Sequence, residues 1–143
     1  MQTFLPYPDF DQSAKILDYR RLGKQRVEAW QILNTLIGKS SGWKNHPAVR
    51  MWRGYEETLA HYGMAMCDEW IRRGYKDTLR PRFEAMLPEN YKLLYYYSFT
   101  YPTWWGNEQF HRSHRSNLLR KKPDFYRELW PKECDTLSYV WPV

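Results

Sequence analysis

The chain has 143 residues and a net charge of +6, with a sequence pI of about 9.3. This length is typical of one domain with a real hydrophobic core, and the positive charge favours a polyanionic partner over a cationic one. No run of residues approaches the roughly 20 apolar positions of a transmembrane helix, and the opening "MQTFLPYPDF" lacks the basic region of a signal peptide.

Two features of the composition bear on function. Aromatic residues make up 18% of the chain, which serves either a Trp-rich core or a surface on which nucleobases stack. The cysteines, Cys67 and Cys134, fall in no metal-binding or redox spacing. We therefore expect reduced thiols in a cytoplasmic protein, although a disulfide between the two is an open alternative.

The first predicted helix follows an irregular or extended opening of ten residues that contains two prolines. Asp11 and Ser13 are both suitable N-caps, and the helix is expected to run to Ile37, because Gly38 is a natural C-terminal stop. Its apolar stripe comprises Leu22, Ala29, Leu33 and Ile37.

A second helix is predicted from Pro47 to the residue before Gly74, which would make it the long central helix of the core. Its apolar positions recur at three- and four-residue steps and give the strongest helical pattern in the chain. They are Trp52, Tyr55, Leu59, Tyr62, Met66 and Trp70.

Residues 75–106 contain three prolines, so we expect an irregular connection that includes "YKLLYYYSFTYP" and one short helix near Arg82–Met86. A third helix is predicted from Asn107 to Lys121, followed by a helical turn in "DFYRELW" and an aromatic tail, "LSYVWPV", packed on the body. The sequence thus predicts an all-α, compact single domain over residues 1–143, with three main helices and a long aromatic-rich connection.

The first basic cluster is "YRRLGKQRVE", which contains Arg20, Arg21, Lys24 and Arg26 with the single carboxylate of Glu28. One interpretation is a helix whose cations hold phosphates while Glu28 acts on a sugar or a leaving base. The alternative is a solvated basic face on which Glu28 is an ion-pair partner of Lys24. The cluster lacks the alternating charges of an ordinary solvated helix, which favours nucleic-acid binding.

A second candidate lies in "NHPAVRMW", where His46 precedes a helix start and Arg50, which is predicted to hold a phosphate, lies one turn further on. His46 is suited to holding a phosphate or donating a proton near neutral pH. Taken alone, a histidine at such a position is more often an ordinary residue of a capping loop.

The third cluster is "EQFHRSHRSNLLRK", in which His111, Arg112, His114, Arg115 and Arg120 are predicted to contact phosphates. Glu108 steps by three to the two histidines, as metal ligands could. This pattern is not the two-His zinc signature, so we expect no metal and no other cofactor. If the three clusters converge, they line one positive hollow with room for a duplex or a flipped nucleotide.

These residues resemble a known family, the pyrimidine-dimer DNA glycosylases of the phage endonuclease V type. "LDYRRL" resembles the family's Tyr-Arg-acid-Leu segment, and "MAMCDEWIRRGYKDT" resembles the end of its long second helix. The segments "RRLGKQRVEA", "NHPAVRMWRGYE" and "FHRSHRSNLLRK" are similar to those of wider bacterial homologues.

The resemblance implies a small three-helix enzyme that binds damaged duplex DNA, kinks it and flips a base out without a metal. In that family the N-terminal α-amine attacks the sugar C1′ and forms an imine, and a carboxylate on the first helix supports base loss and β-elimination. Free α-amines titrate near 7.7–8.0, so many are neutral and nucleophilic at cellular pH. We expect a monomer in the cytoplasm of a bacterium or a phage-infected cell, associated with the nucleoid.

Two departures from the family pattern concern the chemistry. Gln2 is large enough to prevent removal of the first methionine, so the amine would belong to Met1. Arg21 occupies the position of the family's catalytic carboxylate, and Glu28, two turns along the same face, is the substitute. Lys24 is a second candidate nucleophile if its arginine neighbours favour the neutral amine, although such a lysine more often only contacts phosphate.

The leading hypothesis is therefore a DNA glycosylase, with or without AP-lyase activity, that excises a damaged or modified pyrimidine. Trp104 and Trp105 in "YPTWWG" either fill the gap left by a flipped base or pack in the core. The rivals are a non-catalytic nucleic-acid-binding protein of the same fold and a metal-dependent nuclease built on Glu108, His111 and His114.

Overall fold

The computed structural model describes residues 1–93 and 98–143, and all regular elements within them are helical. The expectation of an all-α fold is confirmed. In chain order the elements are α1 (Phe10–Ile16), α2 (Tyr19–Leu36), α3 (Pro47–Arg50), α4 (Glu56–Arg72), α5 (Arg80–Glu84), the 3₁₀ turn η1 (Tyr91–Leu93), α6 (Glu108–Lys121) and α7 (Pro123–Tyr126). No helix in this described part is long and apolar enough to cross a membrane.

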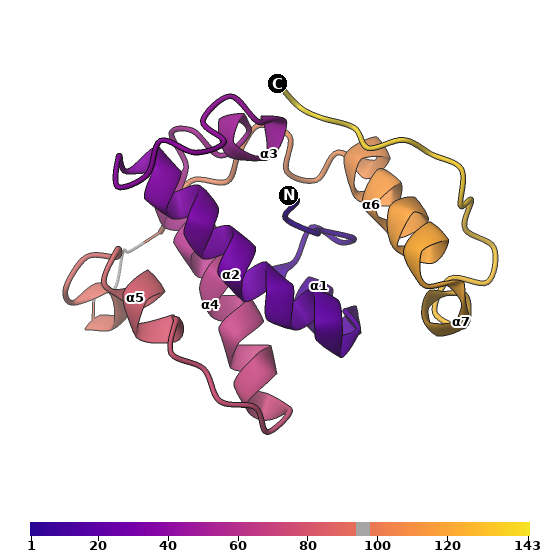
Figure 1. The fold of residues 1–143 in the computed structure, drawn as a ribbon, viewed down its shortest axis with the longest axis horizontal. Helices are drawn as coiled ribbons and strands as arrows, with labels where there is room; N and C mark the ends of the chain where they lie inside the picture. Colours follow the sequence, from indigo (N-terminus) through magenta and orange to yellow (C-terminus); the bar gives the residue numbers. More distant parts are fainter. Residues whose placement is uncertain (94–97) are drawn as a thin grey trace.

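The first predicted helix is wrong as one element, because the stretch from Asp11 to Ile37 is divided between α1 and α2 (Figure 1). Asp18 makes the break: its side chain accepts a hydrogen bond from the Arg21 N–H at 3.4 Å and so caps α2. The hydroxyl of Tyr126 donates to the same carboxylate at 2.6 Å. Burial raises the pKa of Asp18, but these hydrogen bonds and the charge of Arg21 outweigh it and hold the pKa below its usual value.

The second predicted helix is also interrupted, so its single span from Pro47 to Gly74 is wrong. A turn separates α3 from α4, and Gly54 adopts a φ of +89°, which favours glycine. The turn places Trp52 in the core, where its indole N–H donates to the Thr3 hydroxyl at 3.0 Å. A continuous helix would lack the turn that Gly54 makes here.

Helix α4 is the central core helix, as predicted, because ten of its seventeen residues are buried. It packs directly against α2 and α5. At Gly63 an added Cβ would lie 2.4 Å from the ring of Phe83 on α5, so only glycine permits this close approach. Helix α4 also contacts the N-terminal segment, because the Tyr62 hydroxyl donates to the Phe4 carbonyl at 3.0 Å.

The predicted third helix is confirmed as α6, with Asn107 as its N-cap accepting from the Phe110 N–H at 3.2 Å. The short helix of the connection is α5, and the helical turn after Pro123 is α7. Of the connection expected to be irregular, η1 is a 3₁₀ turn and residues 94–97 lie outside the described residues. The aromatic tail packs on the core through Tyr139 and Trp141, as expected.

The N-terminal segment, residues 1–9, is the feature that organises the site. It precedes the first helix and lies between α2 and α6 (Figure 1). Residues 2–6 are all buried. The C-terminal segment runs back along α6 (Figure 1), where the Leu137 N–H donates to Ser116 at 3.0 Å and the Val140 N–H to Ser113 at 3.1 Å.

Candidate active site

A hollow of about 460 Å³ opens where the N-terminal segment meets α2 and the end of α6. We call it the basic pocket. Its walls contain four basic side chains, whereas Glu28 is the one acidic side chain among its lining residues. The full lining comprises Met1, Gln2, Phe4, Arg20, Arg21, Lys24, Gln25, Glu28, Lys121 and Tyr139.

Helix α2 holds the pocket's carboxylate and the N-terminal backbone through one buried side chain, Gln25. Its Nε2 donates to the Gln2 carbonyl and to Glu28 Oε2, both at 3.0 Å. Its Oε1 accepts from the Phe4 N–H at 2.8 Å. Glu28 Oε2 also accepts from the Gln2 N–H at 3.4 Å. Glu28 is therefore fixed one peptide unit away from Met1, at the start of the chain.

Helix α6 holds the next residue of the N-terminal segment with two histidines. The Leu5 N–H donates to His114 Nδ1, and His111 Nδ1 donates to the Leu5 carbonyl, both at 2.8 Å. The Gly106 N–H donates to His111 Nε2 at 3.0 Å, which fixes that ring as the neutral Nδ1–H tautomer. We call this arrangement the histidine clamp.

The histidine clamp corrects the expectation that His111 and His114 contact phosphates. Both side chains are wholly buried, with exposures of 0%. Burial lowers the pKa of His111, and it lowers the pKa of His114 to about 3. Neutral, enclosed imidazoles of this kind position backbone and do not bind an anion at the surface.

Arg112 and Arg115 also have protein partners where phosphates were expected. Arg112 Nε donates to Glu133 at 2.7 Å, and Arg115 Nε donates to the same carboxylate at 3.0 Å. Arg115 also donates to the Pro6 carbonyl at 2.7 Å and pairs with Glu108. Because Arg115 is only 9% exposed, its expected role as a phosphate contact is wrong; it extends the hold of α6 on the N-terminal segment.

Two further arginines lie outside the basic pocket. Arg26 pairs with Asp77, and its guanidinium carbon lies 4.5 Å from the ring centroid of Trp70. Arg120 donates to the Leu137 carbonyl at 3.0 Å and so fastens the C-terminal segment. Neither lines the hollow that contains Met1, so their expected phosphate contacts have no support from the pocket.

His46 and Arg50 lie at the two ends of α3, and neither lines the basic pocket. His46 Nδ1 accepts from the Ala48 N–H at 3.0 Å and caps α3, which is the ordinary role. Burial lowers the pKa of His46, the positive amino terminus lowers it further, and Glu28 acts in the opposite direction. The charges of the amino terminus and of Glu28 therefore both act on the imidazole. Arg50 is exposed and lines a different hollow near the C-terminus.

The aromatic residues divide between core and surface. Trp104 is 7% exposed and its indole N–H donates to the Met51 carbonyl at 3.1 Å, so packing, not gap filling, is its role. Trp105 is half-buried and stacks on Tyr101, with ring centroids 4.6 Å apart. The expectation that Trp104 fills a gap in DNA is therefore wrong.

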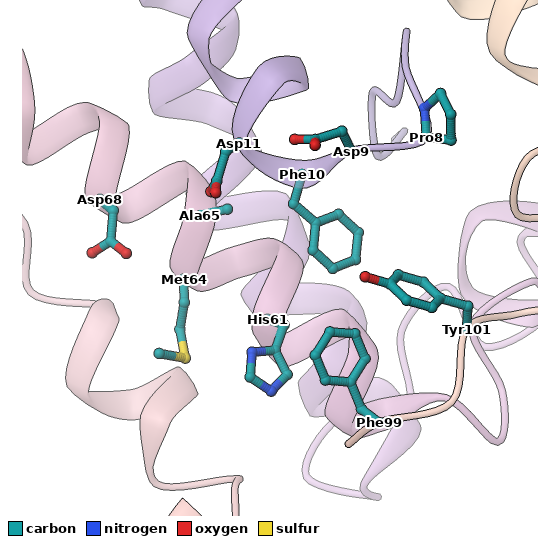
Figure 2. A pocket seen from close by; sticks show the side chains of 10 residues that line it. All are labelled: Pro8, Asp9, Phe10, Asp11, His61, Met64, Ala65, Asp68, Phe99 and Tyr101. Atoms are coloured by element: carbon teal, nitrogen blue, oxygen red, sulfur yellow. The ribbon is translucent and has the colours of Figure 1, made fainter. Parts of the chain in front are cut away.

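A second hollow, of about 320 Å³, has the opposite charge (Figure 2). Asp9, Asp11 and Asp68 contribute carboxylates, and aromatic rings from Phe10 and Tyr101 form part of its wall. Asp9 caps α1 and Asp68 pairs with Arg80, so two of the acids have structural roles. Carboxylates repel phosphate, so this second hollow is unsuited to a polyanion, in contrast to the basic pocket.

Within residues 1–93 and 98–143, no three His, Cys, Asp or Glu side chains are grouped so that they could hold a metal ion. Glu108 pairs with Arg115, while His111 and His114 bind the Leu5 backbone. The three ligands of the proposed metal-dependent nuclease therefore do not converge, and that rival loses its structural basis.

The fold and the basic pocket define a helical protein that is built to receive a polyanion such as a nucleic acid. A family model described as pyrimidine dimer DNA glycosylase matches residues 1–81, more than half of the chain. The chain belongs to the pyrimidine dimer DNA glycosylase family. Family membership supports DNA glycosylase function, with DNA as the substrate. No curated protein and no solved structure shows a significant match.

Several site residues were missed by sequence reasoning. Gln25 appeared only as a polar residue inside a basic run, although it orients Glu28 and two peptide groups of the N-terminal segment. Lys121 and Tyr139 reach the pocket from distant parts of the chain. One observation could have identified Gln25. It lies on the face of α2 that is buried, and a buried side-chain amide needs hydrogen-bond partners.

Proposed function

We propose that this glycosylase removes a damaged or modified pyrimidine from duplex DNA through an imine formed by the α-amine of Met1. Glu28 is its acid/base. The observation that carries the proposal is that Met1 and Glu28 line the same basic pocket, with Glu28 hydrogen-bonded to the Gln2 N–H. An amine and a carboxylate so placed can act on one sugar carbon.

In the proposed reaction, the neutral amine of Met1 attacks C1′, the bond from C1′ to the base breaks, and the base leaves with a proton. The nitrogen then forms an imine with the ring-opened sugar. In the AP-lyase step, Glu28 removes a proton from C2′ and the C3′–O bond breaks, so that the 3′ phosphate leaves. Water finally hydrolyses the imine and frees the amine.

The basic side chains of the pocket are proposed to hold the flanking phosphates. Arg20, Lys24 and Lys121 carry the charge that this needs. Arg21 also lines the pocket, but its guanidinium donates to Asp18 at 3.2 Å. Arg21 therefore has a structural role at the position where the family has its catalytic carboxylate. Glu28 is proposed to supply that carboxylate instead. His46 is proposed to exchange protons with the amine or with Glu28.

Lys24 is the alternative nucleophile, because it is exposed and lines the same pocket. Met1 is the better candidate, since its backbone is fixed beside Glu28 through Gln2 while Lys24 projects from the helix surface. Residues 1–143 are proposed to act as one domain and as a monomer, because one chain completes the pocket. A DNA substrate supports a cytoplasmic location near the nucleoid, in a bacterium or a phage-infected cell.

The test is borohydride trapping of the wild-type protein on duplexes that carry a pyrimidine dimer, other damaged pyrimidines or an abasic site. Borohydride reduces an imine to a stable amine, so we expect a covalent protein–DNA adduct. Peptide mapping of the adduct should place the DNA on Met1 and not on Lys24. Binding without any adduct on any of these duplexes would instead favour the non-catalytic rival.

A charge-neutralising substitution in the pocket should change the salt dependence of DNA binding. For Lys121→Gln we expect weaker binding to a duplex with a tetrahydrofuran abasic-site analogue, and a slope of log K against log salt that is shallower by about 0.9. The matched control is Arg112→Gln, because Arg112 already pairs with Glu133. Equal slopes for wild type and Lys121→Gln would remove Lys121 from the phosphate-binding set.

A further inference from the structure

Two tyrosines form an exposed aromatic surface where α2 begins and α4 ends. The rings of Tyr19 and Tyr75 have centroids 6.4 Å apart and planes inclined by 28°. Tyr75 in turn stacks on Trp70, with centroids 4.2 Å apart and planes inclined by 27°. We call the two exposed rings the tyrosine platform.

The tyrosine platform is open to solvent and yet supported from below. Tyr19 is 48% exposed and Tyr75 is 42% exposed. Beneath them, the indole N–H of Trp70 donates to the Lys76 carbonyl at 2.9 Å, and Trp70 also stacks with Arg26. Two nearly parallel rings held in this way lose little conformational entropy when a third planar group stacks on them.

The charge beside the platform identifies the kind of partner it fits. Arg20 Nε donates to the Tyr19 hydroxyl at 3.2 Å, and its guanidinium carbon lies 5.9 Å from the Tyr19 ring centroid. The same Arg20 lines the basic pocket. The platform is therefore continuous with the surface that receives the DNA backbone, and a planar group attached to a phosphate chain meets both requirements.

We propose that the tyrosine platform stacks a nucleobase of the DNA strand whose sugar occupies the basic pocket. The proposal rests on the proposed function for the location of the DNA. Aromatic rings stack on any base, so the platform adds affinity without adding sequence preference. Arg20 joins the two parts, with its guanidinium near a phosphate and against the Tyr19 ring.

The test uses a duplex with a tetrahydrofuran abasic-site analogue and 2-aminopurine as its neighbour in the same strand. For Tyr75→Leu we expect binding to weaken about tenfold by fluorescence anisotropy, in the range that loss of one base–aromatic stack produces. We also expect the quenching of 2-aminopurine on binding to be lost. The salt slope should stay that of the wild type, since no charge is removed.

Three variants make the result specific. Tyr75→Phe keeps the ring and should bind like the wild type, and Tyr19→Leu should weaken binding as Tyr75→Leu does. Phe125→Leu removes another exposed ring, 40% exposed on α7, and should have no effect. Wild-type affinity and quenching in both leucine variants would contradict the proposal that the tyrosine platform stacks a nucleobase.

Failure of the platform can be distinguished from failure of the proposed function. If both leucine variants bind like the wild type while the wild-type protein still forms the borohydride adduct, only the platform is wrong. If the wild type binds the analogue duplex with leucine-sensitive quenching but forms no adduct, the stacking surface stands and the chemistry is wrong.

Discussion

Replacing Glu28 by glutamine is expected to slow strand cleavage at an abasic site by about 10²- to 10⁴-fold, the contribution typical of a general acid/base. Glutamine has nearly the same shape, and its oxygen can still accept from Gln25 and from the Gln2 N–H. The substitution therefore removes the charge and the basicity of the side chain while leaving the N-terminal segment in place. Single-turnover strand cleavage of an abasic duplex, measured without borohydride, gives the size of the effect.

The control for this prediction is Glu128→Gln, which changes an exposed carboxylate that does not line the basic pocket. It should cleave the strand at the wild-type rate. Affinity for the abasic-analogue duplex should be kept, or slightly raised, in Glu28→Gln, because a negative charge near phosphates is lost. Strand cleavage by Glu28→Gln at the wild-type rate would remove Glu28 from the chemistry.

Acidification is expected to destabilise the fold through the histidine clamp. Burial holds the pKa of His114 at about 3 in the folded protein, against about 6.5 in the unfolded chain. Below pH 6.5 the unfolded chain binds a proton that the folded protein does not bind, so the free energy of unfolding falls as the pH falls. From His114 alone the loss at pH 5 is about 2 kcal/mol relative to pH 7. Burial also lowers the pKa of His111, which adds a loss of the same sign.

Urea denaturation at pH 7 and pH 5 measures this loss. The comparison variant is His114→Asn, whose side-chain oxygen can accept from the Leu5 N–H but does not titrate. We expect the asparagine variant to lose less stability between the two pH values than the wild type, whatever its stability at pH 7. The same loss in both proteins would show that His114 does not drive the acid response.

Local patterns in the sequence predicted the helical elements well where a cap or a stop was visible. Asn107 marked the start of α6, and the pattern around Leu59 and Met66 marked the buried face of α4. The break at Asp18 was readable in principle, since aspartate is a favoured N-cap. It was missed because Asp11 and Ser13 offered earlier caps, and Tyr126, which holds Asp18, is 108 residues away.

The candidate site was predicted only where its residues lie close together in the sequence. Residues that share one face of α2, such as Arg20, Lys24 and Glu28, do line one pocket, since spacing on a helix is a local property. The histidines of α6 were misassigned because alternating His and Arg resembles a solvated anion site. Their partner is the backbone of Leu5, more than a hundred residues earlier, and no local pattern records that contact.

The position of the N-terminal segment has a consequence for how the protein is made. The Leu5 backbone is held by side chains 106 and 109 residues later in the chain. Helices form quickly from local contacts, whereas pairing between distant segments is slow. A ribosome must therefore synthesise α6 before the first residues can dock. The N-terminal segment, made early in translation, therefore reaches its docked position late.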